Sequence, residues 1–384
     1  MQSRTGNLPP VFLVRICLLN FDFSDDDKMI RDQVNRFLRD NCGFGEFRSV
    51  LEGDAAYSEN VWRGLSEMGV QGTAIPSLYG GVDAGYLSLC LAARELGAHL
   101  APVPFSSSIY LAAEAIQRTG SETQKEEWLP KLVSGEIIGT LAVTETVREL
   151  APEDITTTFA KGKLNGTKLV VPHGVMADVA VVLARTNDGL SLVLVSLSEV
   201  ERRSIETVDP TMGSATIMFK DSPAELLGES HDGWAALSSV YNRAAVLFAF
   251  EQLGGAERAL DMAVGYAKER FAFGRPIGSF QALKHMMADM YVALKLAESN
   301  CYYAAWALQN DADDLALAAA TARVSATQAF QLCSRDNIQV HGGMGFTWEY
   351  DCHLYYRRSN YLTLVLGGLS AWEDKLVAAL PDAA

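Results

Sequence analysis

Hydrophobic residues recur at intervals of three and four over the first third of the chain, from residue 21 to about residue 135. This spacing is typical of amphipathic helices, and Ser24 and Asp25 can cap the first of them. Glycines and prolines interrupt the pattern at several points, as expected between helices. The pattern therefore predicts an all-α N-terminal domain over residues 21–137.

The spacing of hydrophobic residues changes from 3.6 to 2 in the middle of the chain. Runs with this shorter period occupy residues 179–184, 192–195 and 215–219. Turn signals such as Asn165-Gly166 separate the runs. The sequence predicts a small central β domain, for which we expect the range 138–230.

Helical spacing returns after residue 233 and continues nearly to the C-terminus. The pattern predicts segments much longer than the average globular helix. We expect them over residues 234–270, 280–309, 314–341, 350–366 and 372–380. Helices of this length usually pack as an antiparallel bundle, often within an oligomer. The predicted fold class is therefore α+β, mainly α, with a C-terminal helical domain over residues 231–384.

Charge and cysteine usage argue against several classes of function. The 384 residues include 47 acidic and 32 basic side chains, which gives a net charge of -15, and the basic residues are scattered. Non-specific nucleic-acid binding needs a positive surface, so we expect no nucleic-acid partner. The six cysteines lie far apart without a C-x-x-C pair, which predicts neither zinc site nor disulfide framework and favours the cytoplasm. No apolar run approaches the ~20 residues of a membrane span.

Two glycine-containing motifs stand in the second half of the chain. The first, around Arg270, has the sequence YAKERFAFGRPIG, and the second, beginning at Gln339, has the sequence QVHGGMGF. Glycine lets the backbone approach a diphosphate, and arginine donates a fork of hydrogen bonds to it. Without further context, each motif is also compatible with a plain turn between two helices.

The α, β, α order, together with these two motifs, closely resembles the acyl-CoA dehydrogenase family of flavoproteins over residues 21–380. The resemblance implies an N-terminal helical domain, a central β domain and a C-terminal four-helix bundle, with FAD between the last two. It also implies α,β-dehydrogenation of an acyl-CoA thioester, with electrons passed to an electron-transfer flavoprotein. Residues 1–20 lie outside the resemblance, and we expect them to form an extension.

In this family the two motifs embrace the pyrophosphate and adenosine end of an FAD that is bound mainly by a neighbouring subunit. The residues of this chain that match those positions are Arg270, Phe273, Gln281, Gln339, Gly342 and Gly343. Ala272 stands where the family usually has a hydroxyl residue, so one minor phosphate contact is in doubt. The resemblance also implies that Thr144 hydrogen-bonds a flavin ring.

The family positions for the catalytic base hold no carboxylate in this chain. A base is needed because the α-proton of a thioester is weakly acidic, while the β-hydrogen leaves as hydride. The usual position falls at Leu366 and a less common one at Ala244, so we expect no catalytic residue. Glu145 and Glu251 are alternative bases. Since Glu251 lies seven residues from Ala244, about 10 Å along a helix, we expect it to be a bundle or surface residue.

The residues that would surround the flavin ring also depart from the family. A glycine-rich turn is replaced by residues 147–152, which include the bulky Arg148 and Leu150. Val170 and Pro172 replace a tryptophan and a threonine that cover the ring in the family. Both changes weaken the expectation that this chain binds the ring itself. We expect the neighbouring His173 to have a surface or loop role.

The adenosine-end residues are kept, whereas the ring-end residues and the base are lost. This asymmetry predicts one subunit of a heteromeric acyl-CoA dehydrogenase, a heterotetramer in which a homologous partner supplies the base and the flavin cradle. By analogy, such heteromers act on bulky thioesters such as those of steroid side chains. Two alternatives stay open: a self-sufficient homotetramer with an unrecognised base, and a catalytically silent scaffold or acyl-CoA-binding protein. Arg357 and Arg358 are expected either at a subunit interface or on a solvated helix face.

Overall fold

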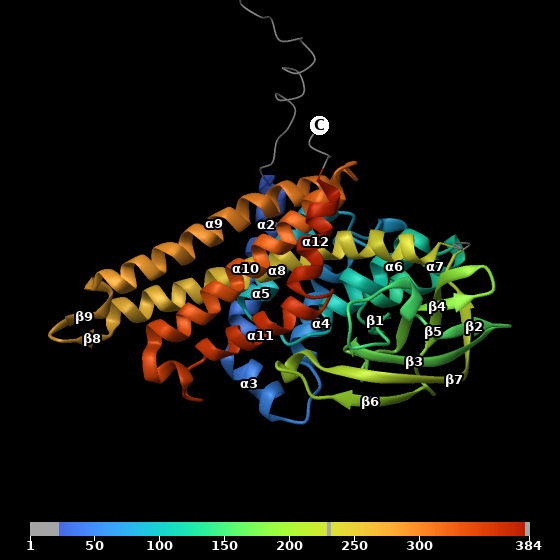
Figure 1. Cartoon of the computed structure of the whole chain (residues 1–384), viewed down its shortest axis with the longest axis horizontal. Helices are drawn as coiled ribbons and strands as arrows, with labels where there is room; N and C mark the ends of the chain where they lie inside the picture. The colour runs from blue at the N-terminus through green and yellow to red at the C-terminus, as the bar shows by residue number, and fades with distance from the viewer. Residues whose placement is uncertain (1–22, 229–231, 381–384) are drawn as a thin grey trace, which may run out of the picture.

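The computed structural model of the chain describes residues 23–228 and 232–380. The expected extension, residues 1–20, lies outside the described residues. Within them, helices come first, β-strands follow, and long helices complete the chain, as Figure 1 shows. The predicted fold class, mainly α with a central β region and a C-terminal helical bundle, is confirmed.

The first helix begins where the sequence predicts. Ser24 Oγ accepts a hydrogen bond from the Asp27 amide at 3.1 Å, and the Asp27 carboxylate accepts one from the Ser24 amide at 3.0 Å. This reciprocal pair satisfies amides that the helix leaves free at its start. The N-terminal helices are α2 (Asp25–Asn41), α3 (Phe44–Glu52), α4 (Glu59–Glu67), α5 (Gly85–Ala98), the π-helix η3 (Ser106–Ala113), α6 (Glu114–Thr119) and α7 (Glu122–Val133).

Seven strands form the central sheet. They are β1 (Gly139–Ala142), β2 (Thr158–Ala160), β3 (Lys163–Pro172), β4 (Val179–Thr186), β5 (Gly189–Ser196), β6 (Glu201–Ile205) and β7 (Ser214–Leu226). β4 pairs with β1, β2 and β5, and β7 pairs with β3, β5 and β6. The pairings from β4 through β2, β3, β7 and β5 return to β4, so these five strands close into a small barrel. Closure removes exposed sheet edges.

The C-terminal helices match the predicted segments to within three residues at most boundaries. They are α8 (Gly233–Glu269), α9 (Gln281–Gln309), α10 (Leu315–His341), α11 (Cys352–Leu364) and α12 (Leu369–Ala379). A short hairpin of β8 (Phe271–Ala272) and β9 (Arg275–Pro276) joins α8 to α9. Figure 1 shows this hairpin at the tip of the bundle, at the opposite end of the molecule from the β-strands.

The N-terminal helices dock on the bundle through direct backbone contact between α5 and α8. A Cβ atom added to Gly97 would lie 1.9 Å from the Glu251 carbonyl oxygen, and one added to Gly254 would lie 1.8 Å from the Arg94 carbonyl oxygen. Both distances are far below any tolerated contact, so only glycine fits at these two crossing points. Gly254 therefore has a packing role.

Arg358 of α11 joins all three parts of the chain from a fully buried position. Its Nε donates to Asp209 Oδ2 at 2.5 Å, and its Nη2 donates to Thr211 Oγ1 at 3.1 Å, both beside η5 (Pro210–Met212). Nη2 also points to the Leu100 carbonyl oxygen, and Nη1 lies 3.7 Å from Glu251 Oε1. Arg358 thus lies neither at a subunit interface nor on a solvated face, and that expectation was wrong. Local sequence could not reveal its partners, which are about 100 to 260 residues away.

We expect Arg358→Ala to lower the free energy of unfolding by about 3–5 kcal/mol, because it leaves buried carboxylates without their cation. Arg203→Ala is the control, since Arg203 is exposed and pairs only with the exposed Glu201; its cost should stay below about 1 kcal/mol. Urea denaturation followed by circular dichroism measures both. Equal loss in the two variants would contradict a joining role for Arg358.

Candidate functional site

The two glycine-containing motifs lie at the same end of the bundle. Tyr266, one turn before the end of α8, stacks on His341, the last residue of α10, with ring centroids 4.1 Å apart. Tyr350 meets both rings edge-on. Since Arg270 caps α8 and Gly342 follows His341, this aromatic contact brings the first motif next to the second.

The residues of the two motifs are open to solvent. Arg270, Gln281, Gln339, Gly342 and Gly343 are all exposed. Among the described residues, the Arg270 guanidinium has no hydrogen-bond or ion-pair partner, although an arginine fork readily pairs with phosphate. Nothing lies within 4 Å of a Cβ built on Gly342 or Gly343, and Gly342 has φ +59. This open, cationic, glycine-lined surface fits the diphosphate end of a dinucleotide.

Phe273 stands at the tip of the hairpin in an unusual state. Its side chain is 94% exposed and its φ is +53, a left-handed conformation that bulky residues rarely adopt. Gly274 follows with φ +79, and the two residues form the turn between β8 and β9. An almost fully exposed aromatic ring on a strained turn indicates a surface that another molecule can bind.

Thr144 lies two residues beyond Ala142, the end of β1, and the β-strands are at the opposite end of the molecule from the hairpin (Figure 1). Its carbonyl oxygen accepts a hydrogen bond from the Leu169 amide at 2.7 Å. Beside it is a hollow of about 20 Å³, lined by Leu111, Leu141, Val143, Thr144, Leu169, Val170, Val171, Pro172, Tyr241 and Val365. Val170 in this lining is 53% exposed. Ligand pockets usually hold about 300–1,000 Å³, so this hollow by itself is too small for a flavin ring.

Two side chains that sequence reasoning missed, Tyr241 and Val365, line this space together with Val170, which it had named. Tyr241 of α8 and Val365, just after α11, reach it from the bundle. Val170 reaches it from β3, where the strand register shifts between Lys168 and Val171. Val170 has φ +50, which is strained for a β-branched residue. Only the packing of strands against helices brings these residues together, so their spacing in the sequence gives no signal.

Both base positions are buried and apolar. Ala244 has no exposed surface and Leu366 is 4% exposed. The Leu366 carbonyl oxygen accepts a hydrogen bond from Trp372 Nε1 at 3.2 Å, which ties it to α12. Neither position can remove a proton. Within the described residues, no cluster of three His, Cys, Asp or Glu side chains could hold a metal ion.

Comparison with known proteins shows the family. The profile of the acyl-CoA dehydrogenase N-terminal domain matches residues 24–136, and that of the C-terminal domain matches residues 231–374. Acyl-CoA dehydrogenase IpdE2 of Mycobacterium tuberculosis is 31% identical over 337 residues, which cover 88% of this chain and 91% of that protein. The chain belongs to the acyl-CoA dehydrogenase family.

Solved structures agree with this assignment. The ChsE4-ChsE5 complex from Mycobacterium tuberculosis superposes with a TM-score of 0.86 at 26% identity, covering 94% of this chain and 100% of that one. A variant of the Tcur3481-Tcur3483 steroid ACAD superposes with a TM-score of 0.84 at 29% identity, covering 92% and 97%. Acyl-CoA dehydrogenases are oxidoreductases that act on acyl-CoA, and FAD is their cofactor.

Glu145 is poorly suited to serve this acyl-CoA dehydrogenase as a base. Its carboxylate accepts hydrogen bonds from Lys168 Nζ at 2.6 Å and from the Thr156 amide at 2.8 Å. Burial acts to raise its pKa, but the bonds from Lys168 and Thr156 outweigh burial and lower the pKa of Glu145 to about 2. A carboxylate so engaged is a weak base and anchors the segment after β1.

Glu251 lies inside the protein, beside the Arg358 guanidinium. Burial raises its pKa to about 7, although Arg358 and Arg323 oppose the rise. Its 4% exposure confirms the bundle alternative and excludes the surface one. Glu251 lines neither the hollow beside Thr144 nor the one in the N-terminal helices.

His173 lies in the turn after β3, as the loop alternative expected, but the surface alternative was wrong. The residue is fully buried, and its Nδ1 lies 3.0 Å from Ser107 Oγ of the π-helix. Burial, aided by the Arg358 charge, lowers the pKa of His173 to about 3. The ring is therefore neutral at physiological pH and joins the end of β3 to the N-terminal helices.

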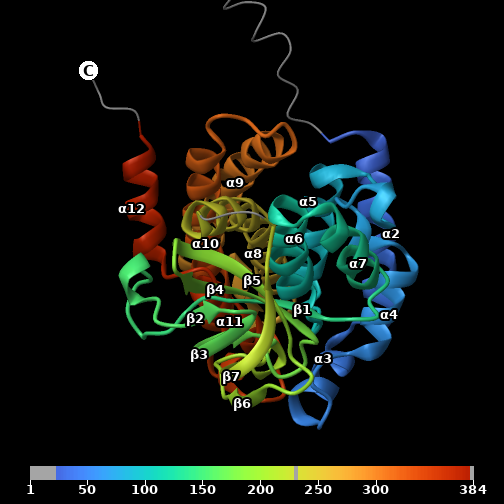
Figure 2. The same ribbon diagram turned by 90° about the vertical axis from the view of Figure 1, so that its right-hand side faces the viewer.

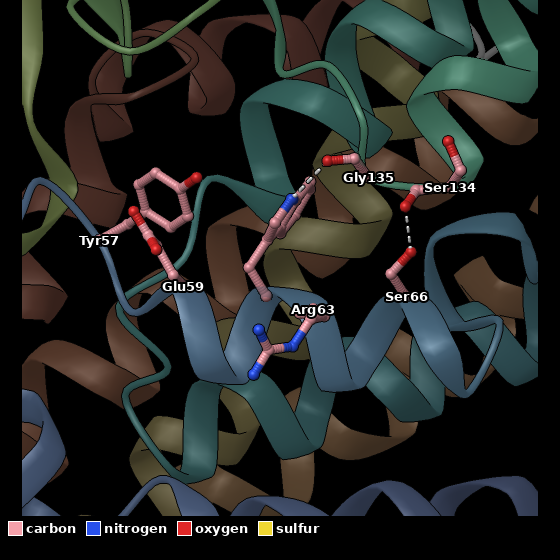
Figure 3. A pocket seen from close by; sticks show the side chains of 7 residues that line it. Tyr57, Glu59, Arg63, Ser66, Ser134 and Gly135 are labelled. Atoms are coloured by element: carbon pink, nitrogen blue, oxygen red, sulfur yellow. Dashed lines mark hydrogen bonds between the residues drawn. The ribbon is translucent and has the colours of Figure 1, made fainter.

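A larger hollow of about 250 Å³ opens in the N-terminal helices (Figure 3). It is lined by Tyr57, Glu59, Trp62, Arg63, Ser66, Ser134 and Gly135. Trp62 Nε1 donates to the Gly135 carbonyl oxygen, and Ser66 Oγ donates to that of Ser134. Its polar groups are thus largely engaged within the protein, and none of the residues matched to the family's FAD contacts line it. In the described residues, no helix is long and apolar enough to cross a membrane.

Glu251 should make stability depend on pH. The pKa of this carboxyl rises from 4.5 to about 7 on folding, so the folded state keeps a proton that the unfolded state has lost. Stability is therefore complete below pH 4.5 and falls as pH rises toward 7, by at most about 3 kcal/mol at 1.36 kcal/mol per pKa unit.

We expect Glu251→Gln to remove this loss, because the amide does not ionise. Urea denaturation of both proteins between about pH 4 and pH 8 measures the difference, because the loss begins at the pKa of the unfolded state. The two curves should meet at the acidic end, and Glu251→Gln should be the more stable protein at the basic end. Parallel curves would show that Glu251 does not titrate in this window.

Proposed function

We propose that this chain is the base-lacking subunit of a heteromeric acyl-CoA dehydrogenase, and that it completes the FAD site of a homologous partner subunit. The observation that carries the proposal is the contrast between its two ends. The surface around Arg270 and Gly342 is open and unpaired, whereas the hollow beside Thr144 is small and lined by the chain's own side chains. A chain that bound its own flavin ring would need the second space to be larger.

In this proposal each motif residue has a defined task at the adenosine end of the partner's FAD. Arg270 donates hydrogen bonds to the diphosphate, whose two charges make such bonds strong. Gly342 and Gly343 let the backbone approach, because no side chain stands between it and the ligand. Gln281 and Gln339 supply amide groups from the start of α9 and the end of α10. Phe273 is covered by the partner or its cofactor.

FAD, when bound, accepts the hydride from the substrate, and the partner supplies the base. This chain would act by holding the cofactor and by closing the interface against water. We propose a bulky acyl-CoA, such as a steroid side-chain thioester, as the substrate, since one solved relative is described as a steroid ACAD. The other is described as a complex of two named chains, which supports a heterotetramer with a homologous subunit. An electron-transfer flavoprotein is the proposed acceptor.

The first test measures flavin content and native mass of the chain purified alone and with a neighbouring homologous gene product. The small hollow beside Thr144 predicts that the chain alone carries no FAD. The mixed complex should be yellow, with one FAD for each pair of unlike chains. A yellow, active homotetramer with one FAD per chain would contradict the proposal.

The second test changes Arg270. We expect Arg270→Ala in the mixed complex to weaken FAD binding by about 10- to 100-fold, the equivalent of about 1.5–3 kcal/mol for a hydrogen bond to a charged group. Arg203→Ala, on the distant β6, should leave the FAD dissociation constant unchanged. If Arg270→Ala also leaves it unchanged while the complex stays assembled, this chain acts as a silent scaffold.

A further inference from the structure

The glycine-rich turn of the second motif is held on one side by its own helix. The turn, residues 342–346, is the 3₁₀ segment η7 (Gly342–Phe346). Gly345 packs back on α10, because a Cβ added to it would lie 2.6 Å from the Ile338 carbonyl oxygen. Gly342 and Gly343 have no such contact. Thr347 Oγ1 donates to the Met344 carbonyl oxygen at 2.9 Å, so the residues that follow the turn also contact it. The shape of the turn therefore depends on how those residues are held.

Arg48 of α3 supplies a contact just after the turn, 300 residues away in sequence. Its Nη2 donates to the Trp348 carbonyl oxygen at 2.6 Å. Its Nε and Nη2 also donate to Asp351 Oδ1, at 2.9 Å and 2.7 Å. The Arg48 guanidinium thus binds two residues that follow the turn, Trp348 and Asp351. The side chains of Arg48 and Asp351 are only 21% and 23% exposed, so solvent screens the pair less than a surface pair.

The indole of Trp348 is held from several directions. Arg48 lies over the ring at 5.3 Å from its centroid, and Arg357 lies at 5.6 Å. The indole Nε1 donates to Glu52 Oε1 at 2.7 Å, which returns the contact to α3. Cation–π contacts with indole are the strongest of their kind. We name Arg48, Glu52, Trp348 and Asp351 the α3 clamp.

We infer that Arg48 is a positioning residue that holds turn 342–346 in the shape that receives a diphosphate. The inference rests on the proposed function of the turn and adds to it an N-terminal residue outside both motifs. Arg48 itself does not touch the ligand; it acts through Trp348 and Asp351. A loop already fixed in its bound shape loses less entropy on binding, so the clamp should improve FAD affinity.

A purely structural tie between α3 and the bundle would have a different signature. It would change the thermal stability of the chain and leave the affinity for FAD as it was. A positioning role instead predicts that the turn loosens locally and that FAD binds more weakly. Turnover should change little once FAD is saturating.

The first measurement is hydrogen exchange of the turn amides, made on the full chain without FAD. Arg48→Gln should speed exchange at Gly342 and Thr347, whose amides bond to the Gln339 and Met344 carbonyl oxygens. The matched control is Arg63→Gln, because Arg63 is exposed on α4 and contacts Asn60 and Glu67 of its own helix. Unchanged exchange at the turn in Arg48→Gln would overturn the inference without touching the proposed function.

The second measurement is the FAD dissociation constant of the mixed complex. Arg48→Gln should raise it roughly 3- to 10-fold, with kcat at saturating FAD unchanged, and Arg48→Lys should fall between the two proteins. Asp351→Asn should give part of the effect, and adding it to Arg48→Gln should give no more than Arg48→Gln alone. Asp351→Asn also serves if Arg48→Gln fails to fold.

The outcomes separate the inference from the function it rests on. Faster exchange with an unchanged FAD dissociation constant would reduce Arg48 to a structural tie. A wild-type mixed complex that binds no FAD would overturn the proposed function, and the positioning role would fall with it. Faster exchange and weaker FAD binding in Arg48→Gln, with Arg63→Gln normal in both, would establish the α3 clamp.

Discussion

A buried guanidinium, that of Arg358, sets how the three parts of this chain meet. A charge without water must find its partners in place, and removing one partner leaves the others uncompensated. Asp209 and Thr211 come from the β-strand region, the Leu100 carbonyl oxygen from the N-terminal helices, and Glu251 from the bundle. The Arg358 guanidinium therefore couples the positions of the N-terminal helices, the β-strand region and the bundle. In Figure 2, α11, which carries Arg358, lies behind the strands of the central sheet.

This coupling has a consequence for the space between the β-strands and the bundle. Glu251, beside Arg358, belongs to the same helix as Tyr241, whose side chain reaches the cavity near Thr144. The backbone contact at Gly97 and Gly254 holds that helix against α5. Contacts at both points thus place α8, and with it Tyr241, beside the hollow at Thr144. The small size of that hollow supports the proposal that the ring is bound elsewhere.

The end of the bundle that carries the two motifs is instead open to solvent. Gly274, Gly342 and Gly343 have no atom within 4 Å of an added Cβ, and Phe273 is held in a strained and exposed state. Such strain persists only where the surroundings impose it, and it collects at functional surfaces. The stack of Tyr266 on His341 aligns the helix ends, and under our inference the α3 clamp steadies the turn that follows. Order at this end comes from a few specific contacts rather than from a core.

The sequence by itself determined the helices, their approximate boundaries and the family. Helical periodicity and capping act over one or two turns, so α2 and α8 begin within a residue or so of where local signals place them. The two motifs were also readable, because each is continuous in the chain. Their joint location at one end of the bundle followed from the resemblance and was then seen in the Tyr266–His341 contact.

Tertiary structure alone decided the state of the isolated polar residues. The residues next to His173, Glu251 and Arg358 in the sequence do not indicate that these three side chains are buried. Their partners lie far away in sequence. Whether a polar residue is buried depends on which distant surfaces cover it, and that is settled when three parts pack together. The same holds for the small cavity at Thr144 and for the contact of Arg48 with Trp348, since both join segments that only long-range packing makes neighbours.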